Sequence, residues 1–345
     1  MSGKEARKDE IVRLIEAADN QSLLETQELA DRFGVSLMTV RRDLKELAQA
    51  GRLQRQYGGA ASVQHPHDKQ RREIGVMLIS QTGKYSDPFF NALLEGVDLK
   101  LTELGHRIAY INTHNEISTA AQMRDILRFN AVDGVILIGP PLGAESLDYL
   151  KANMRALVST IDSIGDEYDT IVFDGYRGMR LMVDHLVNCG HRRLGFITGY
   201  ADTRQQGFMD GLAAHGLSAE PELSVIMPRE MDGWRPALGH LGAEKLMQLA
   251  KPPDAIVCAS DLIAIGAIQW LHQHHLRVPE DIAVTGFDDI PESGFTIPSL
   301  TTIHVHKQLM GELAAERVIK RIENADEIPL FIRTPVQLIV RQSSG

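Results

Sequence analysis

Short apolar segments alternate with helical segments over most of this chain, from about residue 74 onward. The expected strands and helices are 74–79, 89–104, 107–112, 119–129, 134–138, 194–197, 255–258 and 282–285. Such alternation predicts βαβ units with parallel sheets, and therefore an α/β fold. About 270 residues follow this pattern, more than one core usually holds, so we expect two lobes with a cleft between them. Ligands of such sheets bind beyond the carboxyl ends of the strands.

Charge is divided unevenly along the sequence. The formal net charge of −10 on its own argues against a nucleic-acid partner. Residues 39–72, however, contain eight Lys and Arg against three Asp and Glu, whereas residues 73–345 contain 23 against 35. A basic N-terminal segment before an acidic body indicates a small nucleic-acid-binding module joined to a larger domain that phosphates would repel.

The first 50 residues predict two helices that pack together and a third that follows a tight turn. The first two are expected at 10–18 and 26–33, Gly34-Val35 suits the turn, and Ser36 suits the N-cap of a helix that runs to about Ala50. The residues expected to face inward are Ile11, Leu14, Ile15, Leu29, Ala30, Phe33, Leu37, Val40, Leu44 and Leu47. The pattern is helix, turn, helix.

The remaining faces of the third helix are free to meet a DNA groove. Arginine can make bidentate hydrogen bonds to guanine or phosphate, and Ser or Thr at a helix N-terminus can contact bases or backbone. Residues 52–60 predict two short strands around a turn, a wing that brings Arg52 or Arg55 near the flanking phosphates. The expected DNA-binding residues are Ser36, Met38, Thr39, Arg41, Arg42, Lys45 and Arg55.

A long motif supports this interpretation. It consists of Val35-Ser36-x-x-Thr39-Val40-Arg41-Arg42-Asp43-Leu44, then Gly51-x-Leu53-x-Arg55, then Gly58-Gly59-Ala60. The motif resembles the winged helix-turn-helix of DeoR-type regulators over about residues 5–61, with Tyr57 where that family usually has His. The alternative is a helical domain that docks a protein and carries its arginine pair in solvent.

The larger domain carries a second set of motifs. They are Asp87-Pro88-Phe89-Phe90, Phe173-Asp174-Gly175, Gly190-His191-Arg192-Arg193, Gly199, Arg204-x-x-Gly207-Phe208, Ala259-Ser260-Asp261-x-x-Ala264-x-Gly266, Val278-Pro279-Glu280-Asp281-Ile282, Gly286-Phe287-Asp288-Asp289 and Pro298-Ser299-Leu300-Thr301-Thr302-Ile303. This series resembles the LacI/GalR sensor domain and its periplasmic sugar-binding relatives over about residues 73–341. Two positions depart from that family: Asp87 replaces the usual Asn, and Ser260 stands where many members carry Asn.

The second resemblance implies a small-molecule effector, most simply a sugar, in the cleft. Carboxylates accept hydrogen bonds from hydroxyl groups, an arginine donates several, and an aromatic ring covers the C–H face of a pyranose. The residues implied to line the cleft are Asp87, Phe89, Phe90, Asp162, Arg204, Trp234, Ser260 and Asp288. Structural roles remain open for several of them: Ser260 and Asp261 suit a helix cap, Trp234 a core position, Asp288 a turn, and Arg204 a surface ion pair.

Other function classes find little support in the sequence. There is no G-x-S-x-G or H-E-x-x-H motif, and Thr82-Gly83-Lys84-Tyr85 lacks the upstream glycine of a phosphate loop, so we expect neither an enzyme nor a cofactor. His272, His274, His275, His304 and His306 have spacings that a metal could use, but no cysteine or carboxylate set joins them, so no metal site is expected. The polar N-terminus, the two cysteines and the interrupted apolar run 255–271 predict a cytoplasmic protein without a membrane span.

We therefore expect three parts: a winged helix-turn-helix domain at 1–61, a linker at 62–72, and a ligand-binding domain at 73–345. Its N-lobe is expected at 73–173 with 304–330, and its C-lobe at 174–303 with 331–345. The expected function is that of a transcriptional repressor, a homodimer or tetramer that binds a double-stranded DNA operator under the control of its effector. The competing hypothesis is a cytoplasmic sugar-binding protein whose N-terminal domain docks a protein partner.

Overall fold

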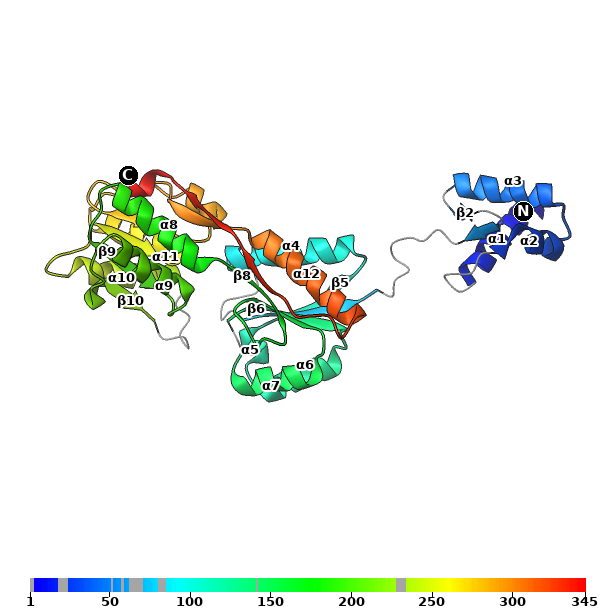
Figure 1. The fold of residues 1–345 in the computed structure, drawn as a ribbon, viewed down its shortest axis with the longest axis horizontal. Helices are drawn as coiled ribbons and strands as arrows, with labels where there is room; N and C mark the ends of the chain where they lie inside the picture. The colour runs from blue at the N-terminus through cyan, green and yellow to red at the C-terminus, as the bar shows by residue number, and fades with distance from the viewer. Residues whose placement is uncertain are drawn as a thin grey trace. The chain divides into compact units, whose positions relative to one another are not determined.

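The computed structural model describes residues 3–17, 24–50, 52–56, 59–61, 71–79, 85–140, 142–227 and 234–345 (Figure 1). The chain divides into two compact units, Met1–Arg71 and Arg72–Gly345. The expected linker, 62–72, lies outside the described residues except for its last two residues.

The first unit is a winged helix-turn-helix. Its elements are α1 (Gly3–Ala17), β1 (Leu24–Glu25), α2 (Thr26–Phe33), α3 (Leu37–Gln49), β2 (Gln54–Gln56) and β3 (Gly59–Ala61). The strands pair antiparallel in the order β1-β3-β2, which confirms the predicted wing and adds a first strand that the sequence pattern did not indicate. Gly34 ends α2 with a φ of 62°, a left-handed conformation that favours glycine and turns the chain into α3.

The core of this unit corrects one prediction about α3. Val40, Leu44 and Leu47 are buried as expected, but Leu37 is 38% exposed. Leu37 is the first residue of the helix, and the inward stripe begins a turn later. Asp43 occupies an inward position instead, and its carboxylate accepts a hydrogen bond from Arg7 Nε at 2.8 Å.

The second unit contains two parallel sheets, which confirms the α/β prediction. The first has the order β14-β8-β7-β6-β4-β5 and all its pairings are parallel. Its strands are β4 (Glu73–Leu78), β5 (Arg107–Thr113), β6 (Gly134–Gly139), β7 (Leu157–Ile161), β8 (Asp169–Phe173) and β14 (Phe331–Thr334). We call this sheet and its helices the first lobe. The predicted boundary at 330 assigned residues 331–334 to the C-lobe. Because β14 pairs with β8, these residues instead belong to the first lobe.

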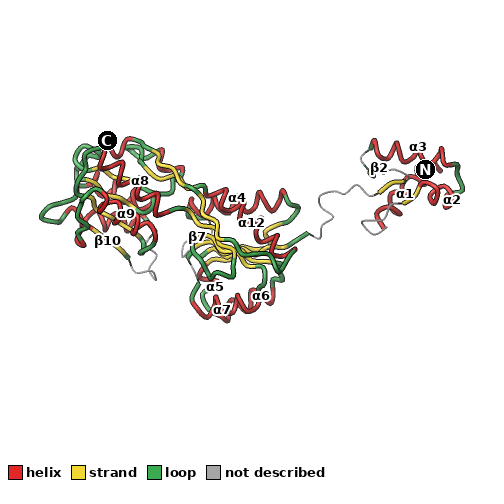
Figure 2. Tube along the Cα trace, in the orientation of Figure 1, coloured by secondary structure: helices red, strands yellow, loops and turns green. Residues whose placement is uncertain are grey.

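Helices cover both faces of the first sheet (Figures 1 and 2). One face is covered by α4 (Pro88–Glu103) and α12 (Lys307–Glu323), the other by α5 (His114–Ile117), α6 (Ala120–Phe129) and α7 (Ala144–Asn153). Alternation within β6 explains the two layers, since Ile136 and Ile138 join the core beneath α4 while Val135 and Leu137 join the opposite one.

The α4–α12 contact depends on two glycines. A Cβ on Gly96 would lie 2.1 Å from the carbonyl oxygen of Gln308, and one on Gly311 would lie 2.1 Å from that of Leu93. Side chains at these positions would push the backbones apart, so the glycines set the close approach of the two helices.

The second lobe repeats the same three-layer arrangement. Its sheet has the order β10-β9-β11-β12, with all pairings parallel. The elements are α8 (Gly175–Asn188), β9 (Leu194–Thr198), α9 (Thr203–Ala214), β10 (Ser224–Ile226), α10 (Pro236–Met247), β11 (Ala255–Cys258), α11 (Asp261–Gln273) and β12 (Ala283–Thr285). Helices α8 and α9 share a core with Phe196 and Val257, whereas α10 and α11 share the opposite one with Ile197 and Ile256.

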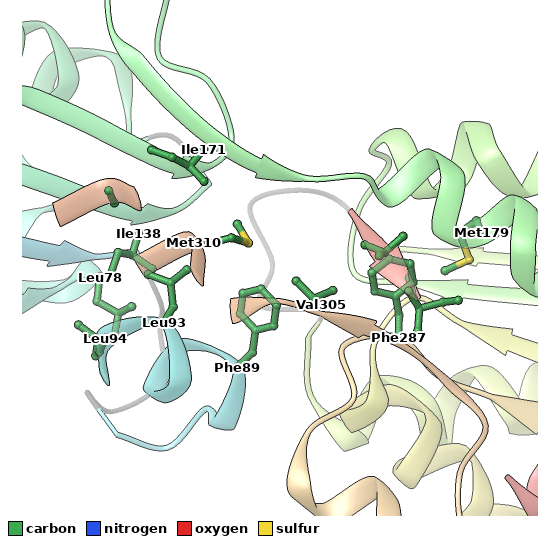
Figure 3. Close-up of a cluster of buried hydrophobic side chains, with 14 of the residues drawn as sticks. Leu78, Phe89, Leu93, Leu94, Ile138, Ile171, Met179, Phe287, Val305 and Met310 are labelled. Carbon is green, nitrogen blue, oxygen red and sulfur yellow. The ribbon is translucent and has the colours of Figure 1, made fainter. Parts of the chain in front are cut away.

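The chain passes between the lobes three times. It crosses once after β8 and twice through an antiparallel pair, β13 (Thr302–Val305) and β15 (Val336–Ile339). Figure 3 shows buried side chains along these crossings, where Phe89 of α4, Val305 of β13 and Phe287 after β12 belong to one apolar cluster. The crossings therefore join the two lobes through packed side chains as well as through the backbone.

Candidate functional site

The start of α3 is organised by two hydroxyl groups. Ser36 accepts a hydrogen bond from Thr39 N at 3.2 Å, and the two side-chain oxygens lie 2.9 Å apart. Ser36 therefore is the N-cap that the sequence indicated, and it satisfies a backbone N–H that would otherwise lack a partner.

The outward face of α3 is cationic and exposed. Arg41, Arg42 and Lys45 are exposed, and none of them forms an ion pair with a residue that the structure describes. Met38 is 76% exposed on the same side of the helix, since it lies three and four residues before the two arginines. The bases and phosphates of DNA could be contacted by this surface without any change in the core beneath it.

Ion pairs that the sequence did not reveal fix α3 against α1. Arg7 reaches the buried Asp43, and Lys4 and Lys8 contact Glu46 at 2.9 and 2.6 Å. Hydrogen bonds from Lys8 and then Lys4 lower the pKa of Glu46 to about 2. Lys4, Arg7 and Lys8 of α1 thus pair with the acidic residues of α3, whereas the arginines of α3 form no ion pair with a described residue.

The wing contains one candidate residue whose side chain lies outside the described part. Arg55 belongs to β2 and its Cα pairs with that of Ala60 in β3. Tyr57, the departure from the DeoR pattern, falls outside the described residues. Arg52, the other cation considered for the wing, instead pairs with Asp9 of α1 at 2.9 Å.

In the second unit, the predicted ligand residues follow the carboxyl ends of strands. Asp87 is the N-cap of α4 and accepts a hydrogen bond from Phe89 N at 2.9 Å. Phe89 is buried and meets Phe90 and Phe173 edge to face, with ring centroids 5.8 and 6.1 Å apart. Asp162 follows β7, and its carboxylate accepts a hydrogen bond from the adjacent Ser163 N.

Arg204 is the central cation of this region. It is 5% exposed, and its guanidinium carbon lies 4.2 Å from the Trp234 ring centroid, with Phe173 and Phe287 at 5.4 and 5.6 Å. Burial opposes the charge, but the Asp202 carboxylate outweighs it and raises the pKa of Arg204. Arg204 therefore forms an ion pair, as the alternative from the sequence allowed, but the pair with Asp202 is largely buried and not at the surface.

Arg204 has hydrogen-bond acceptors for only some of its guanidinium N–H groups. Its Nε and Nη2 donate to Asp202 and its Nη1 donates to the carbonyl oxygen of Ala259 at 2.8 Å. Two of the five guanidinium N–H groups thus have no partner among the described residues. The arginine is held rigidly and can still donate.

Asp288 supplies the complementary negative group. It is 7% exposed, and no residue in the described part of the chain donates a hydrogen bond to its carboxylate. Burial, followed by the charge of Asp261, raises its pKa well above the ordinary value, although Arg204 and Lys307 act in the opposite direction. Its φ of 114° places the backbone in the region that favours glycine, so the loop constrains this residue at a cost in strain.

Lys307, which the sequence did not single out, fixes the backbone beneath Asp288. Its Nζ donates to the carbonyl oxygens of Asp288, Asp289 and Val305, the last two at 3.2 Å. Burial lowers the pKa of this lysine. All three of its N–H groups are occupied, so Lys307 acts as a support and leaves the Asp288 carboxylate accessible to another donor.

Two further candidates have structural roles. Ser260 caps α11 by accepting a hydrogen bond from Ile263 N at 3.3 Å. Asp261 is buried, and its carboxylate accepts hydrogen bonds from Ile290 N, Ser293 and Thr302. Burial raises the pKa of Asp261 to about 6. Asp261 therefore fastens the loop after Asp288 to the crossing strand β13.

The described contacts bring most of the candidates together. Phe89, Phe90, Arg204, Trp234 and Asp288 are joined by ring contacts and by electrostatic interactions. The sequence missed Phe173 and Phe287, whose rings lie between Phe89 and Arg204, although both stood inside quoted motifs. It also missed Asp202, which lies two residues before the arginine that it holds.

Metal and membrane sites find no support in the described residues. No group of three or more His, Cys, Asp or Glu side chains among them is arranged to hold a metal ion. His304 instead contacts Asp289 at 2.8 Å, within the crossing. None of the described helices combines the length and the apolar character that a membrane crossing requires.

A winged helix-turn-helix joined to a two-lobed α/β unit, with buried charges and aromatic rings at its strand ends, defines the class of ligand-responsive DNA-binding regulators. Residues 7–65 match the DeoR-like helix-turn-helix domain, and residues 183–344 match the periplasmic binding protein-like domain. The chain belongs to the LacI/PurR family of bacterial transcriptional regulators.

Curated relatives support this assignment along most of the chain. The HTH-type transcriptional repressor PurR of Aliivibrio fischeri is 30% identical over 281 residues, which cover 79% of this chain and 81% of that protein. The repressor PurR of Haemophilus influenzae (strain PittEE) is 27% identical over 338 residues, covering 92% and 97%. The chain is thus a DNA-binding transcriptional repressor, and the prediction that it is not an enzyme is confirmed.

A solved structure shows the same fold. The complex of the transcriptional regulator CelR with cellobiose has a TM-score of 0.70 at 24% identity, covering 89% of this chain and 90% of that one.

Proposed function

We propose that this repressor reads its operator with α3 and the wing and senses a carbohydrate at the carboxyl ends of its strands. In this proposal α3 enters the major groove. The residues that contact DNA are Ser36, Met38, Thr39, Arg41, Arg42, Lys45 and Arg55. Support comes from the exposed cations of α3, which pair with no carboxylate in the described part of the chain and can therefore neutralise phosphates or donate to guanine without first breaking such an ion pair.

One observation carries the effector proposal: the carboxylate of Asp288, a residue only 7% exposed, accepts no hydrogen bond from a described residue and interacts electrostatically with an arginine enclosed by three rings. Holding a carboxylate in such a place is costly unless a ligand donates to it. Hydroxyl groups are suitable donors, and they can accept from the two remaining N–H groups of Arg204. The proposed ligand residues are Asp87, Phe89, Phe90, Asp162, Arg204, Trp234, Ser260 and Asp288.

The apolar part of the site suits the carbon face of a sugar ring. Phe90 and Trp234 are half-buried, with the buried Phe89 beside Phe90, and such rings next to polar groups form the combination that binds alternating C–H and O–H surfaces. The cellobiose-bound CelR structure shares the fold and thus provides a precedent for a carbohydrate in such a domain.

The repressor acts as a homodimer, or a tetramer, in this proposal. Two copies of α3 would then reach two half-sites of a near-palindromic operator. The effector changes operator affinity because it binds two arrangements of the lobes with different affinities.

A thermal-shift screen tests the effector proposal. The full-length protein would be heated with monosaccharides, disaccharides, polyols, sugar phosphates and nucleosides. A ligand present at about 100 times its Kd stabilises the protein by about 2.7 kcal/mol. A sugar should raise the Tm of the wild type but not of Asp288→Asn, while Asp281→Asn, an exposed control, keeps the shift. An equal shift in Asp288→Asn would contradict the site, and a shift with nucleosides alone would contradict the carbohydrate class.

A further inference from the structure

The first turn of α3 presents an apolar side chain to solvent. Met38 is 76% exposed and Leu37 beside it 38%, and neither belongs to the apolar core of the first unit. Exposed single apolar residues are common, but this one lies at the N-terminal end of the helix that the proposed function places in the groove.

The neighbours of Met38 leave it as the free side chain of that turn. Ser36 and Thr39 are engaged with each other through their hydroxyl oxygens, 2.9 Å apart, and Ser36 also caps the helix. Their polar atoms are therefore partly satisfied before DNA arrives. Direct reading of bases by hydrogen bonds from this turn is correspondingly limited.

Charge around Met38 indicates which partner covers it. Arg41 and Arg42 follow it by three and four residues, and Lys45 lies on the same side one turn further. Three exposed cations without an ion pair among the described residues, beside one thioether, do not suit an apolar protein surface. They suit a polyanion that also carries an apolar group, and the thymine C5-methyl group is the apolar feature of the major groove.

We propose that Met38 is a specificity-determining residue that packs on the methyl group of one thymine in each operator half-site. The proposal rests on the proposed placement of α3 in the major groove. A methionine has three rotatable bonds and a polarizable sulfur, so it can fit a methyl group that projects from the edge of a base pair. Arg41, Arg42 and Lys45 would hold the helix in place through phosphates or guanines, and Met38 would select A·T over G·C at one position.

The test begins by selecting operator sequences with the full-length protein from a random duplex library. Each thymine of the selected site is then replaced singly by uracil, which deletes the C5-methyl group and leaves the hydrogen-bonding edge unchanged. Loss of one buried methyl group should weaken binding by the wild type about fourfold. At the same position Met38→Ala should bind the thymine and uracil duplexes equally.

Two controls make the result specific to Met38. Gln49→Ala, an exposed change at the other end of α3, should retain the fourfold preference for thymine. Because Met38 is exposed, its replacement should leave the Tm unchanged, and a thermal melt checks this. If every uracil duplex affects the wild type and Met38→Ala alike, or the selected half-site has no fixed thymine, the assignment of Met38 is wrong.

Failure of the underlying proposal gives a different result. If Arg41→Gln and Arg42→Gln bind the selected duplex as tightly as the wild type, α3 is not the reading helix, and the Met38 proposal falls with it. If those variants lose binding but no thymine methyl depends on Met38, only the Met38 proposal is overturned.

Discussion

Replacing Arg41 and Arg42 of α3 with glutamine should reduce the salt dependence of operator binding. Both side chains are exposed and form no ion pair within the described residues, so each is available to neutralise a phosphate. Each neutralised phosphate contributes about 0.9 to the slope of log K against log salt concentration. If each arginine of a dimer neutralises one phosphate, four contacts disappear and the slope decreases by about 3.6.

This slope converts directly into affinities. Between 50 and 200 mM salt, the wild type should lose about 150-fold more affinity than the double variant. Fluorescence anisotropy with a labelled operator duplex at four or five salt concentrations measures both slopes. The double variant Arg128→Gln and Lys320→Gln removes the same charge from exposed positions of the second unit and should keep the wild-type slope. A decrease of less than about 1 in the α3 variant, at an unchanged Tm, would refute the phosphate-contact argument.

Three further predictions concern stability. Asp288→Asn should raise the Tm at pH 8. Burial raises the pKa of Asp288 in the folded protein, so the stability contributed by its protonated carboxyl group is complete below about pH 4 and is lost as the pH rises through that raised pKa. Melts across pH 4–8 should therefore show the Tm values of the two proteins converging at low pH, and a constant difference in Tm would contradict this. Gly311→Val should destabilise the protein by about 1–3 kcal/mol because its Cβ would lie 2.1 Å from a backbone oxygen; urea unfolding measures the loss, and Gly294→Ala, whose Cβ meets nothing within 4 Å, should show none. Asp169→Asn should cost about 3–5 kcal/mol because this fully buried carboxylate accepts from the buried Arg317 and the half-buried Arg321. The exposed change Asp281→Asn should have little effect on the same measurement, and equal losses would rule out burial as the cause.

The fold was largely predictable because it depends on periodicity and turn residues. Helix 26–33 and the cap at Ser36 matched the prediction, and the expected strands ended within about a residue of the observed ones. The two-residue strand β1 was not predictable, since so short a segment has no period and forms only because β3 lies beside it. The position of β14 also depended on pairing partners 161 residues away in sequence, which no local pattern specifies.

The candidate site was predictable as a set of residue types at strand ends, but not as a set of contacts. The motifs indicated Arg204 and Asp288, yet they could not show that Asp202 accepts from two of the five guanidinium N–H groups. Lys307 follows β13 and lies 19 residues after Asp288, and its role arises from where β13 crosses between the lobes. Buried partners of this kind come from tertiary packing, and composition and spacing carry no information about them.

Neither lobe is a continuous stretch of sequence, and this affects how the protein forms during synthesis. The first lobe begins with β4 at residue 73, but its sheet is complete only when β14, at residues 331–334, pairs with β8. Helix α12, which covers one face of that sheet, is also encoded after the whole second sheet. A ribosome that has made only the first half of the chain therefore holds strands with one face covered by α4 alone, while the second sheet has all its strands by residue 285. The second sheet can thus assemble before the first, although it is translated later.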